Sequence, residues 1–141
     1  PVSVVDAQFC IPYTAAMVMM GEKPGPGWYT RENLDNRAII DLASKVRVNV
    51  DPELDRVYVE NEELTARVEV ITQKGDSLVE FVEIPFGDPR NPLSVKDVED
   101  KFRNQASFVL DDNQINQAVK MILDFDKLAN IDELMTILAG K

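Results

Sequence analysis

The spacing of the apolar residues changes twice along this chain of 141 residues, and this change constrains the fold more than any single motif. Up to about residue 45 the apolar residues follow helical spacing, from Val46 to Ile84 they alternate with polar ones, and after Ser94 helical spacing returns. Alternation is typical of a half-buried strand, and helical spacing is typical of an amphipathic helix. The sequence therefore predicts an α+β fold: a small antiparallel sheet with a buried helix, followed by three C-terminal helices.

The stretch DAQFCIPYTAAMVMMG, residues 6–21, contains the most apolar of the predicted helices. Pro12 suits the first position of a helix, where its missing N–H is not needed, and Gly21 suits the position just after the end. Because Tyr13 to Met20 is apolar on nearly every side, we expect this helix to be buried all round, with its methionines in the core.

A loop rich in glycine and proline, GEKPGPGWYT at residues 21–30, follows the buried helix. Thr30 predicts the cap of a short helical turn, and Asn36 predicts the cap of a second helix that runs to about Lys45. These residue types are favoured at caps because a side-chain oxygen accepts a hydrogen bond from a backbone N–H of the first turn. The chain before residue 46 is thus expected to be mostly helical.

The alternating region predicts a sheet of three strands. Val46–Val50 alternates valine with arginine and asparagine, and Ala66–Ile84 holds two further runs around the turn sequence QKGD. Glycine in that turn favours an antiparallel hairpin. The acidic run ENEE, Glu60–Glu63, is expected to be a loop or a solvated edge.

Three amphipathic helices are predicted after the second proline-rich loop, PFGDPRNPLS. The first begins at Ser94, which forms a capping pattern with Asp97, and the others span Asp112–Phe125 and Asn130–Leu138. Each helix carries a broad apolar face, and the small sheet offers limited surface to cover them all. We therefore expect a further polypeptide surface to cover these helices.

Composition excludes several functions. Asp and Glu total 25 against 15 Lys and Arg, and the net charge of -10 opposes binding to nucleic acid or to an anionic membrane surface. Histidine is absent, which removes the commonest general base near neutral pH and the commonest metal ligand. A single cysteine, no secretion signal and no membrane-spanning run together favour the cytoplasm. We expect no cofactor and no metal, because the chain contains no phosphate loop and no metal-ligand spacing.

Three blocks of the sequence are more specific together, in this order, than any one of them: DAQFCIPYTAAMVMMG, LASKVRVNVDPELD and FGDPRNPLSVKDVEDKFR. They resemble the C-terminal part of the MmgE/PrpD family, which includes 2-methylcitrate dehydratases, cis-aconitate decarboxylase and iminodisuccinate epimerase. The first block is similar to the family's lid segment, an Ala-x-Phe-Ser-x-Pro-Tyr-like run that enters an apolar helix. The third is similar to its Gly-x-Pro-x-Asn-Pro-Leu-Ser loop.

The resemblance implies a partial α+β lid domain at residues 1–92 and, at residues 93–141, C-terminal helices that would complete a helical domain. In the family most of that helical domain precedes the lid and carries the main acid and base residues, none of which matches a position here. The implied function is the lid and C-terminal segment of a cofactor-free enzyme that dehydrates, decarboxylates or epimerises a small di- or tricarboxylate. The implied partners are this carboxylate substrate and a helical-domain polypeptide, without which we expect the chain to be inactive.

Tyr13 is the candidate catalytic residue and a candidate substrate-binding residue. The resemblance matches it to the family's lid tyrosine, whose phenol could hydrogen-bond the substrate or shuttle a proton. The helix start beside it offers unpaired backbone N–H groups to a carboxylate. The alternative is a tyrosine packed at a helix start with its hydroxyl bonded to the backbone.

Cys10 and Arg90 are the other candidate substrate-binding residues. Cys10 precedes the helix start, although most free cysteines behave as small buried hydrophobes. Arg90, in GDPRNP, could pair with a carboxylate, although a proline-rich loop between sheet and helix is chiefly a connector. Asp6 is expected to be a solvated charge rather than a general base.

A function of a different class stays open. The chain is alternatively a stand-alone ligand-binding or protein-interaction domain that covers its apolar helices by self-association into a homo-oligomer. If the chain is a piece cut from a longer protein, the interpretation of that oligomer changes, but the function of the longer protein does not.

Overall fold

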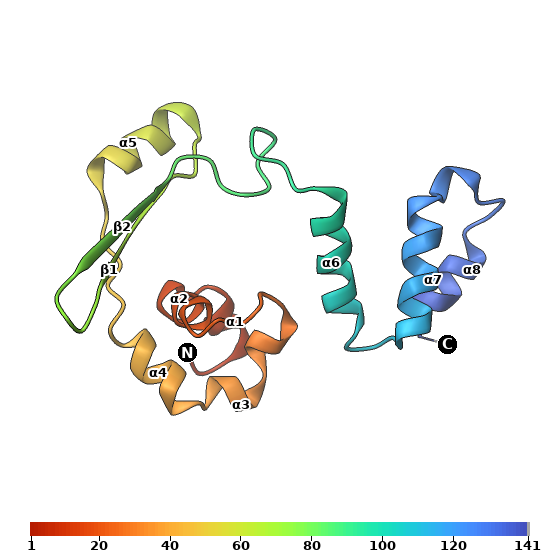
Figure 1. Cartoon of the computed structure of the whole chain (residues 1–141), viewed down its shortest axis with the longest axis horizontal. Coiled ribbons are helices and arrows are strands. Elements are labelled where there is room, and N and C mark those ends of the chain that lie inside the picture. The colour runs from red at the N-terminus through yellow and green to blue at the C-terminus, as the bar shows by residue number, and fades with distance from the viewer. Residues whose placement is uncertain (141) are drawn as a thin grey trace. The chain divides into compact units, whose positions relative to one another are not determined.

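The computed structural model describes residues 1–140, which form two compact units (Figure 1). One unit joins Pro1–Val46 to the helices that begin at Val95, and the other is Arg47–Ser94. The elements are, in chain order, α1 (Val4–Gln8), α2 (Ile11–Met19), the 3-10 helix η1 (Pro26–Tyr29), α3 (Arg31–Leu34), α4 (Arg37–Ala43), α5 (Pro52–Asn61), β1 (Ala66–Ile71), β2 (Ser77–Val82), α6 (Val95–Ala106), α7 (Asp112–Leu123), the 3-10 helix η2 (Phe125–Lys127) and α8 (Asp132–Leu138). The predicted α+β fold is confirmed. The domain division at residue 92 stays a prediction.

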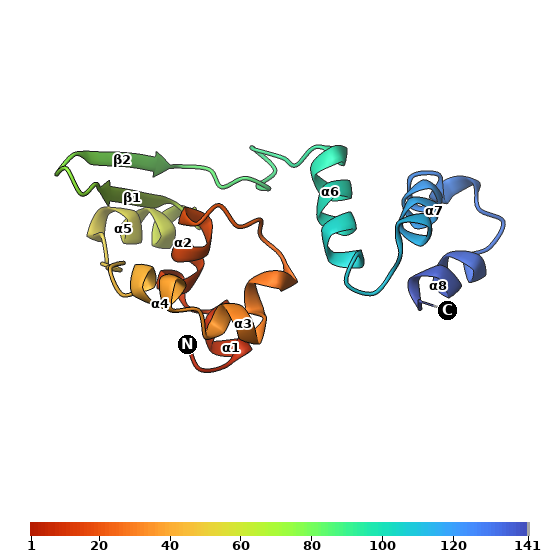
Figure 2. The ribbon, with the colours of Figure 1, turned by 60° about the horizontal axis from the view of Figure 1, so that its bottom comes forward.

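Helix α2 is buried on one face, which packs against α1 and α4 (Figure 2). The side chains of Tyr13, Ala16 and Met17 on this face are fully buried. The large exposed side chains of this helix and its C-terminal cap are Ile11, Val18, Met19 and Met20. The expectation that the helix is buried all round, with every methionine in the core, is therefore wrong for this chain, because α1 and α4 leave the second face uncovered.

Local signals begin these helices, and the starts of α2, α3 and α4 lie largely as predicted, whereas α1 was not predicted. Helix α1 starts with a capping box in which Ser3 Oγ accepts from the Asp6 N–H and the Asp6 carboxylate accepts from the Ser3 N–H. Pro12 stands at the second position of α2, one residue later than expected, where an N–H also has no partner within the helix. Thr30 and Asn36 cap α3 and α4 as predicted, each accepting a hydrogen bond from a backbone N–H.

The N-terminal core gathers around the buried face of α2. Its buried members are Ala7, Tyr13, Ala16, Met17, Trp28, Leu34 and Ile39. They come from α1, α2, η1, α3 and α4, so five short elements share one cluster. Short helices have little stability of their own in water, and this shared burial is what holds them.

The three predicted C-terminal helices are confirmed, and α7 and α8 pack side by side (Figures 1 and 2). Helix α7 begins with a capping box between Asp111 and Gln114. The buried residues form two clusters, Ala106, Leu110, Ile115 and Val119 in one and Ala118, Leu134 and Ile137 in the other. Phe102 of α6 packs against both. Val98 of α6 and Val109 after this helix are 53% and 74% exposed.

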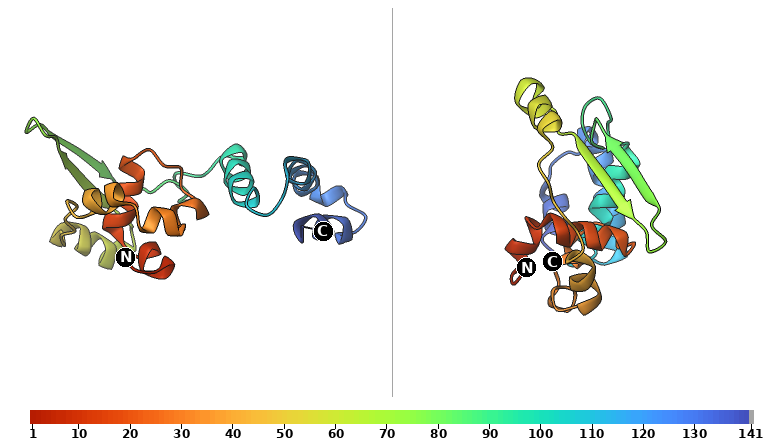
Figure 3. Two further views of the ribbon diagram at one scale, coloured as in Figure 1. Left: turned by 90° about the horizontal axis from the view of Figure 1, so that it is seen from below. Right: turned by 90° about the vertical axis from the view of Figure 1, so that its left-hand side faces the viewer.

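Strands β1 and β2 form the predicted antiparallel hairpin (Figure 3). Ala66 pairs with Val82 at the open end, and Ile71 pairs with Ser77 next to the turn. Gly75 in the turn has φ of +90°, a left-handed conformation that glycine adopts without a steric penalty. The QKGD signal therefore located this turn correctly.

The third predicted strand, Val46–Val50, does not form, and the sheet has two strands. Its valines alternate, but a strand also needs a partner ladder, which alternation cannot supply. Helix α5 was missed, although Asp51 caps it and Pro52 opens it, the usual signals of a helix start. Glu60 lies in α5, so the acidic run expected as a loop is partly helical.

We predict that Ile39→Ala lowers the free energy of unfolding by about 2–4 kcal/mol, because it empties a buried site in the N-terminal core. Ile39 is 2% exposed, whereas Val50 is 80% exposed and provides the matched control. Urea denaturation followed by far-ultraviolet circular dichroism measures both variants, and Val50→Ala should change the unfolding free energy by less than about 0.5 kcal/mol. Equal effects of the two substitutions would contradict this assignment of the core.

Candidate functional site

Tyr13 lies in the first turn of α2 with its whole side chain buried. Its hydroxyl donates a hydrogen bond to the backbone carbonyl of Trp28, with 2.5 Å between the oxygens. Its ring stacks on that of Tyr29, with the ring centroids 6.5 Å apart. Burial, and to a lesser extent Tyr29, raises the pKa of the Tyr13 phenol above its usual value. The phenol is therefore neutral at pH 7, and in this conformation its proton is engaged by the backbone.

The turn that covers Tyr13 is η1, in the glycine- and proline-rich loop. Trp28 of this turn is 7% exposed, and its indole Nε1 has no hydrogen-bond partner. Asn33 Nδ2 donates to the Gly27 carbonyl at 2.8 Å, and Asn104 Nδ2 donates to the Pro24 carbonyl at 2.9 Å. The turn is thus fixed by side chains of α2, α3 and α6.

Cys10 is the N-cap residue of α2 and lies three residues before Tyr13. Its side chain makes no capping hydrogen bond, and its carbonyl accepts from the Thr14 N–H at 3.0 Å. The thiol is partly buried and packs against the N-terminal core. The structure therefore brings Cys10 and Tyr13 to the same helix start, as the sequence predicted, and shows a packing contact for the thiol.

An open depression of about 510 Å³ lies between α1, the Pro24–Tyr29 turn and α6, within the first unit. Its walls come from α1, from the Pro24–Tyr29 turn, including Trp28, and from Gln105 of α6. The polar side chains that line it are amides and a phenol, namely Gln8, Gln105 and Tyr29. Amide N–H groups can donate hydrogen bonds to carboxylate oxygens, so the depression has the size and the donors to receive a small polar acid.

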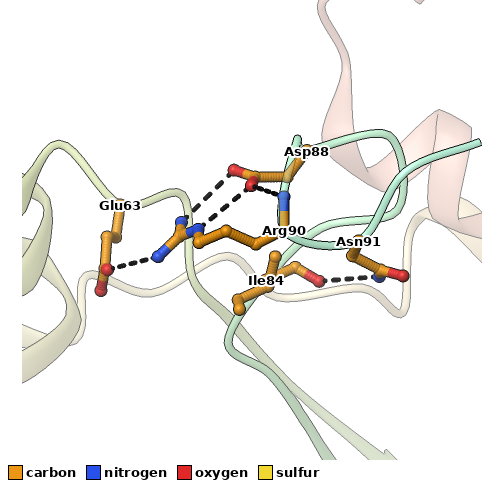
Figure 4. A network of polar contacts seen from close by, with 5 residues as sticks. All are labelled: Glu63, Ile84, Asp88, Arg90 and Asn91. Carbon is orange, nitrogen blue, oxygen red and sulfur yellow. Dashed lines mark hydrogen bonds and ion pairs between the residues drawn. The ribbon is translucent and has the colours of Figure 1, made fainter.

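Arg90 lies in the other unit, in the loop between β2 and α6, and is held by two carboxylates (Figure 4). Its Nε and Nη2 donate to the Asp88 carboxylate at 3.1 and 3.3 Å, and its Nη1 donates to Glu63 at 2.7 Å. Asn91 Nδ2 donates to the Ile84 carbonyl in the same loop. The Arg90 guanidinium thereby connects this loop to the segment between α5 and β1.

The carboxylates around Arg90 also determine its charge environment. The hydrogen bonds from Arg90 lower the pKa of Asp88 below its usual value, and Asp88 and Glu63 raise the pKa of Arg90 further. Two carboxylates against one guanidinium leave this cluster with a net negative charge. A substrate carboxylate would have to displace one of them, and substrate binding by Arg90 stays a prediction.

The Arg47–Ser94 unit has an open depression of its own, of about 470 Å³, between α5 and the hairpin. Glu53, Glu63 and Glu83 line it. Its one arginine, Arg67, pairs with Asp51 at 3.2 Å and lies over the Phe81 ring. This excess of carboxylates repels a di- or tricarboxylate.

Trp28 and Asn33 are the residues at this site that the sequence analysis did not select. The signal was the PGPGW run, in which a large aromatic residue directly follows a glycine in a proline-rich loop and is therefore a candidate for packing onto the core. Among residues 1–140, no three cysteine or acidic side chains lie close enough to hold a metal ion. No helix in that part of the chain is long and apolar enough to cross a membrane.

Comparison with known proteins assigns a family to this arrangement. The model of the MmgE/PrpD C-terminal domain matches residues 1–125. Human cis-aconitate decarboxylase is 27% identical over 142 aligned positions, which cover 99% of this chain and 28% of that protein. Alkylcitrate dehydratase phiI of Fungal sp. (strain ATCC 74256) is 27% identical over 142 positions, which cover 96% of this chain and 28% of that protein. The chain thus spans little more than a quarter of the length of these relatives.

We predict that Tyr13→Phe destabilises the chain by about 1 kcal/mol, because it removes the buried hydrogen bond to Trp28 and leaves that carbonyl without its donor. Tyr58→Phe is the matched control, since the Tyr58 side chain is 53% exposed. Urea titrations monitored by circular dichroism compare the two variants. A Tyr13→Phe variant that is no less stable than Tyr58→Phe would show that this hydrogen bond contributes nothing.

We predict that Arg90→Gln raises the pKa of Asp88 toward its usual value, because the lowered pKa comes chiefly from Arg90. Since the pKa of Asp88 is lower in the folded state, its ionised form stabilises the fold above about pH 4, and this contribution is lost as the pH falls through the folded pKa. Carboxyl NMR titration measures the shift, with Arg31→Gln as the control because Arg31 pairs with Asp35 in the other unit. An unchanged Asp88 pKa in Arg90→Gln would contradict the network.

Proposed function

The chain belongs to the MmgE/PrpD family, and we propose that it forms the substrate-binding lid and C-terminal helices of a cofactor-free enzyme acting on a small di- or tricarboxylate. The observation that carries this proposal is the family match over residues 1–125. The two relatives are named for a decarboxylation of cis-aconitate and a dehydration of an alkylcitrate. Both compounds are polycarboxylates, which supports the substrate class but leaves dehydration, decarboxylation and epimerisation as alternatives.

In the proposed enzyme, the start of α2 binds or orients the substrate. The first backbone N–H groups of a helix lack partners within the helix and carry its positive dipole end, which suits a carboxylate. Cys10 and Tyr13 are placed at this helix start. Tyr13 would hydrogen-bond the substrate or pass a proton once its hydroxyl is released from Trp28.

The base that abstracts the substrate proton would come from a helical-domain polypeptide. This chain has no histidine, and in the part that the structure describes the carboxylates nearest to Tyr13 in sequence are exposed, including Asp6, which caps α1. The chain also matches only 28% of either relative, so most of such an enzyme lies outside this sequence. We propose that the chain alone is inactive and that its cellular location is the cytoplasm.

Exposed apolar side chains support a helical partner. Phe9 before α2 is 85% exposed, Ile11 in α2 is 60% exposed, and Val109 after α6 is 74% exposed. Apolar groups of this size favour burial by about 1.5–3 kcal/mol each when they are fully covered. A polypeptide that covers them would complete the helical domain that the family match implies.

The same exposed side chains favour a second candidate function. A homo-oligomer that buries them between copies would give a stand-alone ligand-binding or interaction domain with no need for another polypeptide. The two proposals differ in the mass of the native particle. A complex with a larger helical chain supports the enzyme, and a homo-oligomer of the 15.9 kDa chain supports the interaction domain.

We predict that the purified chain does not turn over cis-aconitate, 2-methylcitrate or iminodisuccinate. We expect the native complex to turn over one of them, and Tyr13→Phe to reduce the rate of that complex by about 100-fold if the phenol transfers a proton. Substrate loss and product formation are followed by chromatography and mass spectrometry, with Tyr58→Phe as the control for a tyrosine outside the site. Turnover by the purified chain would contradict the proposal that a partner polypeptide supplies the base. An inactive native complex would contradict the proposed enzyme activity.

A further inference from the structure

The Pro24–Tyr29 turn lies over Tyr13, places Trp28 in the N-terminal core and is further connected to its surroundings by single hydrogen bonds. The Trp28 carbonyl accepts from the Tyr13 hydroxyl, and the Gly27 carbonyl accepts from Asn33 Nδ2. On the side of α6, the Pro24 carbonyl accepts from Asn104 Nδ2. A backbone–side chain hydrogen bond of this kind has a modest net effect on stability, so the loss of one bond can shift the position of the turn.

Two features of the turn favour a second position. The Trp28 Nε1–H is buried without a partner, which is unfavourable in the closed position and is relieved when the indole reaches water. Gly21, before the turn, has φ of +79°, and a Cβ placed there would meet nothing within 4 Å. The chain at Gly21 is thus free of side-chain packing and can act as a hinge.

We propose that the Pro24–Tyr29 turn is a latch that closes over Tyr13 in this structure and opens as a unit to expose the phenol. In the closed position the Tyr13 ring has no exposed surface, and its hydroxyl is bonded to Trp28. In the open position the Tyr13 ring and its hydroxyl reach solvent, and the hydroxyl is free to bond a ligand. The latch rests on the proposed function only for the role of the open state, in which the Tyr13 hydroxyl would bond the substrate. The motion of the turn can be measured without any enzyme activity.

The first experiment measures access to Tyr13 in the unaltered chain. Tetranitromethane nitrates exposed tyrosines, and peptide mapping by mass spectrometry reports each tyrosine separately. Tyr58, 53% exposed, is the internal reference and should react at least about tenfold faster than Tyr13. Opening of the latch exposes Tyr13 and Trp28 but leaves most of the core buried, so the Tyr13 rate should rise with urea much less steeply than global unfolding does.

The second experiment weakens the latch with Asn33→Ala, which removes the hydrogen bond to Gly27. We expect nitration of Tyr13 to accelerate by about fivefold, the effect of one net hydrogen bond, with the circular dichroism unchanged. Trp28 is the one tryptophan of the chain, so acrylamide quenching of its fluorescence reports the turn directly and should rise with the nitration rate. Asn113→Ala, at an exposed position of α7, should change neither quantity.

Several results would overturn the latch. Nitration of Tyr13 in the unaltered chain that rises with urea as steeply as global unfolding would show that only unfolding exposes the phenol. Protection of Tyr13 and Trp28 that is unchanged in a folded Asn33→Ala variant would show that the turn does not move as a unit. If Asn33→Ala does not fold, the urea dependence of Tyr13 nitration in the unaltered chain decides whether the latch exists. An inactive native complex leaves these readouts unaffected, so failure of the latch and failure of the proposed function are distinguishable.

Discussion

The hydrogen bond from the buried Tyr13 hydroxyl to the Trp28 carbonyl connects the start of α2 to the turn fifteen residues later in the chain. Around it, α1, α2, η1, α3 and α4 share a single apolar cluster. None of these elements is long enough to be stable in isolation, so their mutual burial determines whether the N-terminal part folds. The candidate site is built on the same contact, since Cys10 is the N-cap residue of α2 and Trp28 lines the open depression.

This contact gives Tyr13 two roles that compete. A tyrosine that stabilises the core through its hydroxyl cannot at the same time offer that hydrogen to a substrate, because a phenol has one O–H. Functional residues often combine a structural and a functional role in this way. Where the surrounding structure has modest stability, the side chain can exchange between its structural partner and a ligand. The glycines around η1 make this turn the place in the N-terminal part where such an exchange needs the least rearrangement.

Much of the fold was predictable because its signals are local. The hairpin was located by a glycine turn between two alternating runs, and Thr30 and Asn36 cap their helices as the residue types indicate. The failures concern non-local packing. Alternating valines at residues 46–50 suggested a strand, but a strand forms only where a partner ladder exists, and the all-apolar α2 is buried on one face since its neighbours cover only that face.

The sequence by itself determined the hairpin, most of the longer helices, the caps of α3 and α4, the family, and the choice of Tyr13, Cys10 and Arg90 as candidates. These properties depend on residue type and spacing along the chain. The tertiary structure alone decided the partners of two candidates in this conformation: the Tyr13 hydroxyl is bonded to a backbone carbonyl, and Arg90 is held by Asp88 and Glu63. Such partners are distant in sequence or hidden in a loop, and a side chain's function depends on which groups surround it after folding.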